Sequence, residues 1–311
     1  MFDWSTHKKS VHGSDNFPLT WADDGHQYAA WGDGWGFNDA PVKVSLGVSR
    51  IIGGKDDYYG RDVWYNRGKS YGIISIAGVL YMWVTRDHDH PDFPETLLYK
   101  SVNKGRSWTR PSWKFDKALG IVTPKILQFG KDYSGAYDEY VYCYFVKFRS
   151  GAFSIQKPGE VHVFRTPKDR MMDRTSYRFF DGKSWNVNLS DSRPILTDPD
   201  GFGLYNSVSY NAPLKKFFMV IEHTKSWSGN MAIYSADTPF GPWSIELKQF
   251  GFGETTFYWN FSNKWLSSNG EKFVMAFTGV GDNDAFHTIE GSIKKKPVDI
   301  SGALYLLLGT E

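Results

Sequence analysis

Three carboxyl-bearing residues lie where hairpin symmetry could bring acidic side chains together. Asp15 and Asp33 are each nine residues from the centre of the turn Asp23-Asp24-Gly25, and Glu222 is nine residues after Pro213. Residues equally distant from a turn become neighbours at the same end of an antiparallel hairpin. Carboxyl groups placed together can act as a general acid and a general base. We therefore take these three as catalytic candidates.

The same counting about the other turns brings basic, polar and aromatic side chains to the same ends of the hairpins. Around Ala77-Gly78, for example, it pairs Arg86 with Lys69. Convergent charges beside aromatic rings are typical of a site for a polar ligand. His12 and His223 join the catalytic candidates, and seven residues are predicted to bind substrate: Trp35, Lys69, Arg86, Lys125, Tyr205, Asn206 and Trp259.

The elements that must position these residues are short strands. Helical periodicity is nearly absent, and apolar runs of about 6–10 residues are split by Gly, Asp, Asn and Pro, which predicts an all-β chain. Five returning strands resemble one another: HQYAAWGDG, VLYMWVTRD, EYVYCYFVKF, KKFFMVIEHT and EKFVMAFTGV. Repeats of about 50–60 residues built from such strands predict a β-propeller. We expect a single five-bladed propeller over 1–311, with 1–11 and 298–311 as closing or peripheral segments; a two-sheet sandwich is the rival fold.

Composition excludes several other classes of protein. The chain has 13 Trp, 18 Tyr and 23 Phe among 311 residues, which is incompatible with disorder. A formal net charge of +2 argues against a dedicated nucleic-acid binder. Apolar runs are too short for a membrane span. Most aromatic residues, such as Phe217, Phe273 and Tyr144, are expected to pack the strands, while Trp31, Trp35, Tyr205 and Trp259 are candidates for stacking on sugar rings.

Strand-end motifs resemble those of five-bladed carbohydrate-active enzymes. The motifs are Gly105-Arg106-Ser107-Trp108, Gly182-Lys183-Ser184-Trp185 and Gly241-Pro242-Trp243, and IYSADTPFGPWS is similar to segments of the family 43 glycosidases. The N-terminal block GSDNFPLTWADDGHQYAAWGDGWGF resembles a narrower group, a domain of long-unassigned function whose characterised members include endo-D-arabinanases. The resemblance implies glycosidase activity at the central funnel, with Asp15 as base or nucleophile. Asp33 or Glu222, which hairpin counting places at the same mouth, would be the partner acid.

One departure from family 43 keeps other reactions open. The family's acidic residues on the third and fourth inner strands are missing, because these strands read VTPKILQF and LYNSVSY here. A polysaccharide lyase is therefore an alternative, with a His, Tyr or Lys base and with Arg or Lys neutralising a uronate carboxylate. A sugar-binding propeller without catalytic activity is a third possibility.

Few features point to cofactors or to a compartment. Arg86-Asp87-His88-Asp89-His90 is the densest group of metal-ligand residue types, but it reads as a solvated loop, and no metal or other cofactor is predicted to be required. Cys143 lies in an apolar strand and is expected to be an inert thiol. The expected partner is a polysaccharide or oligosaccharide, with no nucleic acid and no membrane. Met1–Ser10 lacks the pattern of a signal peptide, although the suspected activity favours a secreted or periplasmic location.

Overall fold

The computed structural model describes residues 1–37, 40–85, 93–122, 124–148 and 159–294. These residues form strands β1 to β21 and contain no α-helix, so the all-β prediction is confirmed. Within these ranges, no helix has the length and apolar character needed to cross a membrane. Short 3-10 turns connect some strands: η1 (Lys117–Leu119), η2 (Lys131–Tyr133), η3 (Arg174–Ser176), η4 (Leu189–Asp191) and η5 (Gly281–Asn283).

The strands of the described residues pair as antiparallel groups in chain order. The first group is β2 (Asp15–Trp21), β3 (Gln27–Gly32), β4 (Leu46–Ile52) and β5 (Tyr59–Asn66). The second is β6 (Lys69–Ile76), β7 (Val79–Thr85), β8 (Glu95–Ser101) and β9 (Phe115–Asp116). The third is β10 (Lys125–Ile126), β11 (Tyr140–Phe148), β12 (Gly159–Pro167), β13 (Arg178–Phe180) and the short β14 (Trp185–Asn186). The predicted returning strands are the second strands of their groups.

The last two groups complete this series. The fourth is β15 (Phe202–Asn211), β16 (Lys216–His223), β17 (Met231–Ala236) and β18 (Ser244–Gln249). The fifth is β19 (Thr256–Phe261), β20 (Lys272–Gly279), β21 (Phe286–Ser292) and the N-terminal β1 (Phe2–Ser10). One pair, Gly159 with Phe202, joins the third and fourth groups into one nine-stranded sheet. Because the strands are divided among four separate sheets, a two-sheet sandwich is excluded.

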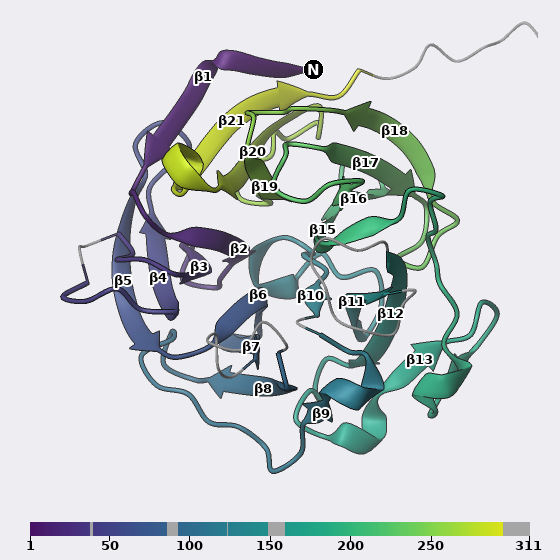
Figure 1. Cartoon of the computed structure of the whole chain (residues 1–311). Helices are drawn as coiled ribbons and strands as arrows, with labels where there is room; N and C mark the ends of the chain where they lie inside the picture. Colours follow the sequence, from purple (N-terminus) through teal and green to yellow (C-terminus); the bar gives the residue numbers. More distant parts are fainter. Residues whose placement is uncertain (38–39, 86–92, 123, 149–158, 295–311) are drawn as a thin grey trace, which may run out of the picture.

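Figure 1 shows these groups arranged around a common centre, with the first strand of each group innermost. The inner strands β2, β6, β10, β15 and β19 contact one another in this order, and β19 also contacts β2. Residues at the starts of five distant segments are thereby brought close together. This arrangement supplies the place where a site can form.

The N-terminal strand lies at the outer edge of the fifth group. It pairs antiparallel with β21, from Phe2 opposite Gly291 to Ser10 opposite Phe286. The pairing covers an edge of β21 that would otherwise present unpaired backbone groups. The predicted C-terminal peripheral segment, 298–311, lies outside the described residues.

Aromatic side chains fill the spaces between the groups, as predicted for most of them. The ring of Trp83 packs against Phe115 and Phe164 with centroid distances of 5.6 and 6.0 Å. Phe217, Phe273 and Tyr144 are all buried, as expected for packing residues. Cys143 is also buried, and burial raises the pKa of its thiol to about 12, so it stays protonated and inert near neutral pH.

Packing in the first group depends on a glycine that leaves room for Trp31. A methyl group added at Gly47 would lie 2.2 Å from Cζ2 of the indole, whose N–H donates a 2.7 Å hydrogen bond to Ser49. Gly47→Ala should therefore lower the free energy of unfolding by about 1–3 kcal/mol, as overpacked cores do. Urea unfolding measures this change. Val102, which is 72% exposed, supplies the control, since Val102→Ala should stay within about 0.5 kcal/mol. Equal stability of the Gly47→Ala variant and the native protein would contradict this packing.

Candidate functional site

Irregular backbone marks the starts of the inner strands. The pairing register shifts between Asn16 and Leu19 in β2, between Ser70 and Gly72 in β6, between Phe202 and Asn206 in β15, and between Phe257 and Asn260 in β19. Three bulky residues there have positive φ: Asn16 (78°), Phe17 (56°) and Tyr258 (53°). Bulges and residues in such sparsely populated conformations concentrate at functional sites, where they redirect side chains.

The first part of the site is an acidic cluster between the first, second and fifth groups. In the pairing of β2 with β3, Asp15 lies opposite Gly32, the residue that precedes Asp33. Lys69 forms an ion pair with Asp33. Gly32 leaves space there, because an added methyl group would lie 2.8 Å from Oδ1 of Asp15 and 3.2 Å from Nζ of Lys69. Hairpin counting had placed Asp15 and Asp33 as neighbours and had paired Lys69 with Arg86; the structure brings Lys69 to the two aspartates.

Burial and neighbouring charge perturb the pKa of Asp15. Burial raises its pKa to about 7; Lys69 opposes the rise, while Asp33 and Asp284 add to it. Asn16 donates a 2.5 Å hydrogen bond to Oδ1 of Asp15. Asp15 is therefore a carboxyl group that changes protonation near neutral pH, as a general base or acid requires.

The second part of the site surrounds Glu222, at the end of β16. This side chain is buried, and its Oε1 accepts a 2.8 Å hydrogen bond from the backbone N–H of Trp227. Burial raises the pKa of Glu222 to about 8, against hydrogen bonds from Trp227 and Ser226 and the charge of Lys125. Burial lowers the pKa of Lys125 to about 7, while its ammonium group donates a 2.6 Å hydrogen bond to the carbonyl of Leu204. Glu222 is therefore largely protonated at neutral pH.

Three tyrosines pack together beside these two parts. Ring centroids are 5.5 Å apart for Tyr71 and Tyr205, and 5.8 Å apart for Tyr205 and Tyr258. The pKa of Tyr205 is raised first by burial and then by the charges of both Asp15 and Glu222. Tyr205 is thus close to both carboxyl groups and, like Tyr71, stays neutral.

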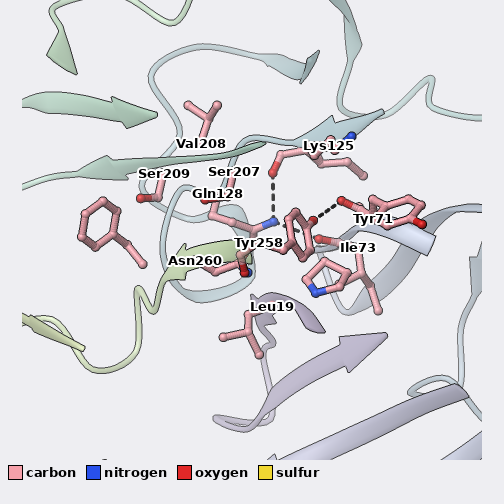
Figure 2. Close-up of a pocket in the computed structure, with 14 residues that line it drawn as sticks. Leu19, Tyr71, Ile73, Lys125, Gln128, Ser207, Val208, Ser209, Tyr258 and Asn260 are labelled. Carbon is pink, nitrogen blue, oxygen red and sulfur yellow. Dashed lines mark hydrogen bonds between the residues drawn. The ribbon is translucent and has the colours of Figure 1, made fainter. Parts of the chain in front are cut away.

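The tyrosines also close the centre of the molecule below the site. Figure 2 shows Tyr258 pointing towards Tyr71, whose carbonyl accepts a hydrogen bond from the Tyr258 hydroxyl. Beneath them, Gln128 donates hydrogen bonds of 2.9 and 3.1 Å to the carbonyls of Ile73 and Ile126. The cavity that remains is about 10 Å³, roughly the space of one water molecule.

The structure brings six of the predicted residues to this site: Asp15, Asp33, Lys69, Lys125, Tyr205 and Glu222. Asn206 is buried directly after Tyr205, with no hydrogen-bond partner for its amide among the described residues. Trp35 is 40% exposed, and Nζ of Lys43, whose charge also acts on Asp15, lies 5.9 Å from the centroid of its indole. Arg86 lies outside the described residues.

Three other predicted residues do not join it. The ring of His223 lies 4.9 Å from that of Phe250, because neighbouring residues of a strand point to opposite faces and Glu222 takes the inner one. Trp259 packs in an apolar cluster with Phe252. His12 is exposed just before β2. The positions of these side chains give no support to roles in catalysis or substrate binding.

Sequence reasoning left four residues out of the site: Lys43, Tyr71, Tyr258 and Asp284. Asp284 follows the second strand of the fifth group, as Asp33 follows the second strand of the first, so hairpin position was the available signal. Burial raises the pKa of Asp284 to about 6, with Lys43 opposing the rise and Asp33 adding to it. Tyr71 and Tyr258 lie at bulges, which strand alternation alone does not reveal.

No group of three or more potential metal-ligating His, Cys, Asp or Glu side chains occurs in the part of the chain that the structure describes. The segment Arg86-Asp87-His88-Asp89-His90 lies outside it. The carboxyl, amino and phenol groups of the site are types that can exchange protons and form hydrogen bonds.

Solved structures that are similar to the chain have one class of fold. A β-xylosidase structure has a TM-score of 0.58 at 12% identity, covering 94% of this chain and 96% of that one. An endo-arabinase from Bacteroides thetaiotaomicron has a TM-score of 0.55 at 12% identity, with 93% and 99% covered. A family 43 β-xylosidase/α-arabinofuranosidase from a compost microbial metagenome, in complex with xylotriose, has 0.58 at 11% identity, with 96% of each covered. The fold is that of the propeller-type glycosidases.

Sequence comparison identifies the family to which the chain belongs. No curated protein sequence matches it. Residues 71–275, more than half of the chain, match the family described as "Domain of unknown function (DUF4185)". The chain belongs to this family.

Proposed function

We propose that the protein is a glycoside hydrolase that cleaves a polysaccharide or oligosaccharide at the mouth of a five-bladed β-propeller. In this proposal the five strand groups are the blades of one domain, and the starts of the inner strands form the mouth. The observation that carries the proposal is the pair of carboxyl groups, Asp15 and Glu222, which each have a raised pKa and whose charges both raise the pKa of Tyr205. Two carboxyl groups in different environments are what hydrolysis of a glycosidic bond needs.

The environments of the carboxyl groups divide the roles between them. Glu222 is buried with a pKa of about 8, so it holds the proton that a leaving oxygen must receive. Asp33 is partly exposed and forms an ion pair with Lys69, so we assign it no proton transfer in this proposal. Asp15 has the lower pKa of the proposed pair and serves as the base or nucleophile. Asp33 and Lys69 then adjust the charge of Asp15.

The substrate class follows from the lining and from the similar structures. Phenol hydroxyls and the amino groups of Lys69 and Lys125 suit sugar hydroxyls, and aromatic faces suit the apolar side of a sugar ring. The similar structures are named as a β-xylosidase, an endo-arabinase and an α-arabinofuranosidase, some with xylose or xylotriose bound. We propose pentose polymers first, including the D-arabinan suggested by the N-terminal resemblance.

A substrate panel tests this function. The protein is incubated with D-arabinan, L-arabinan, xylan, galactan and a uronate-containing polymer, and both new reducing ends and ultraviolet absorbance are followed. Hydrolysis gives reducing ends without a conjugated double bond, which is the expected result. Absorbance rising with cleavage would show elimination, and binding without any product would show a non-catalytic module; either outcome would overturn the proposal.

The pH dependence of kcat/KM provides a second prediction. The active form needs Asp15 ionised and Glu222 protonated, so activity should rise as pH passes about 7 and fall as it passes about 8. Lys69→Met removes the cation that holds the pKa of Asp15 down, and the acidic limb should therefore move to higher pH. Initial rates across pH measure both limbs. The exposed Lys216, paired with Asp237, supplies the control variant Lys216→Met, whose profile should not move. An unmoved acidic limb in Lys69→Met would contradict the role of Asp15.

A further inference from the structure

A shallow hollow of about 690 Å³ lies beside Glu222, between the segments 224–230 and 250–255. It is lined by Lys225, Ser226, Trp227, Ser228, Gly251, Glu254, Thr255 and Val280. We call it the Trp227 hollow. It adjoins the site directly, because the backbone N–H of Trp227 donates to Oε1 of Glu222 and Ser226 hydrogen-bonds the same carboxyl group.

Backbone hydrogen bonds hold together the two segments that line the Trp227 hollow. The N–H of Gly229 donates a 3.0 Å hydrogen bond to Thr256, and the N–H of Phe252 donates a 2.9 Å hydrogen bond to Gly229. Gly229 has a φ of 65°, and an added methyl group would lie 2.4 Å from the Phe252 carbonyl oxygen. Only glycine allows this approach. The hollow is therefore preformed, which lowers the entropic cost of binding a ligand.

The backbone at the Trp227 hollow is also held in sparsely populated conformations. Trp227 has a φ of 58° and Glu254 a φ of 63°, both positive in residues that have a side chain. Such conformations persist where the surrounding structure enforces them, and they concentrate at binding and catalytic sites. Here they place an aromatic side chain and a carboxylate around one hollow.

The chemistry of the hollow suits a sugar residue. Trp227 is partly exposed, and its ring packs against Phe257 at 6.5 Å. The ring of Phe257 in turn packs against Tyr205 at 4.6 Å, so the hollow is connected to the tyrosines of the site by ring packing. Lys225 and Glu254 are exposed at the rim, where they can donate to and accept from hydroxyl groups. An aromatic face with polar groups at its edge matches the apolar face and hydroxyl edge of a pyranose or furanose ring.

We propose that the Trp227 hollow binds the sugar residue on the leaving-group side of the scissile bond, with Trp227 as its stacking residue. This inference rests on the proposed role of Glu222 as acid. The acid protonates the oxygen that departs with the leaving sugar. That sugar must therefore lie on the Glu222 side of the site, away from Asp15, and the Trp227 hollow is the preformed space there.

Comparing two substrates of one sugar tests the inference. On the polymer that the native protein cleaves best, Trp227→Ala should lower kcat/KM about tenfold, which corresponds to about 1.4 kcal/mol. On the glycosyl fluoride of the same sugar, whose leaving group is too small to fill the hollow, kcat/KM should stay within about twofold. Trp227→Phe should recover most of the activity on the polymer, because it keeps an aromatic face. Equal losses on both substrates would overturn the inference.

Controls separate this inference from the proposed function and from misfolding. Native protein that releases no product from any glycan refutes the proposed function itself, whereas active native protein with an unselective Trp227→Ala variant refutes only the leaving-group site. An unchanged basic limb of the pH profile in Trp227→Ala shows that Glu222 is still held in place. Trp108, half-buried in the second group, supplies the matched variant Trp108→Ala, which should cleave both substrates normally.

Discussion

Asp15→Asn should lower kcat on the best glycan by about 10³-fold, within the range that a positioned base contributes, with little change in KM. Asparagine has the same shape as aspartate, and its carbonyl oxygen can still accept the hydrogen bond from Asn16. The variant therefore keeps the packing of β2 while losing the group that takes a proton from water or attacks the sugar. Reducing-end assays give kcat and KM, and thermal unfolding checks that the fold is intact.

Asp282→Asn is the matched control for the Asp15 prediction. Asp282 is exposed in η5, two residues before Asp284, and its side chain is not part of the acidic cluster. This variant should cleave at the native rate. Full activity of Asp15→Asn, with an unchanged melting temperature, would rule out Asp15 as base or nucleophile and would direct attention to Asp33 and Asp284.

Glu222→Gln should slow polymer cleavage by about 10²–10⁴-fold, the range expected for a general acid. Glutamine can still accept the hydrogen bond from the Trp227 N–H, so the segment around it stays in place. The loss should be much smaller on an aryl glycoside with an acidic phenol, because that leaving group departs without protonation. The basic limb of the pH profile, assigned to the pKa of about 8, should also disappear. Steady-state rates on the two substrates across pH measure both effects.

Glu139 supplies the control for the Glu222 prediction. Its side chain is 79% exposed and pairs with Lys168 away from the site, so Glu139→Gln should behave as the native protein on both substrates. If Glu222→Gln loses as much activity on the aryl glycoside as on the polymer, Glu222 does not protonate the leaving group. A structural or substrate-binding role would then replace the catalytic one.

Local patterns predicted much of the fold and part of the site. Alternating apolar runs predicted the strands, and symmetry about the turn Asp23-Asp24-Gly25 placed Asp15 beside Asp33, because β2 and β3 pair as counted. The same symmetry placed Glu222 near Tyr205, since β15 pairs with β16. Hairpin pairing is local, so sequence distance from a turn translates directly into spatial proximity.

Bulges explain where the predictions failed. An extra residue between Phe257 and Asn260 changes which side chain faces the centre, so Tyr258 lines the site and Trp259 packs between strands. Glu222 and His223 were both predicted to be catalytic. They are consecutive residues of β16, so their side chains point to opposite faces of the strand. A bulge is set by packing against several other strands, and one residue of displacement reverses the face of every side chain.

The pairing of β1 with β21 has a consequence for how the chain folds. Phe2 and Gly291 are neighbours in space but lie at opposite ends of the described sequence. Contacts of such high sequence separation form late, since the loop-closure entropy must be overcome before they stabilise anything. During synthesis, residues 2–10 must wait until residue 292 has left the ribosome. The fifth strand group therefore cannot be completed before synthesis has passed residue 292.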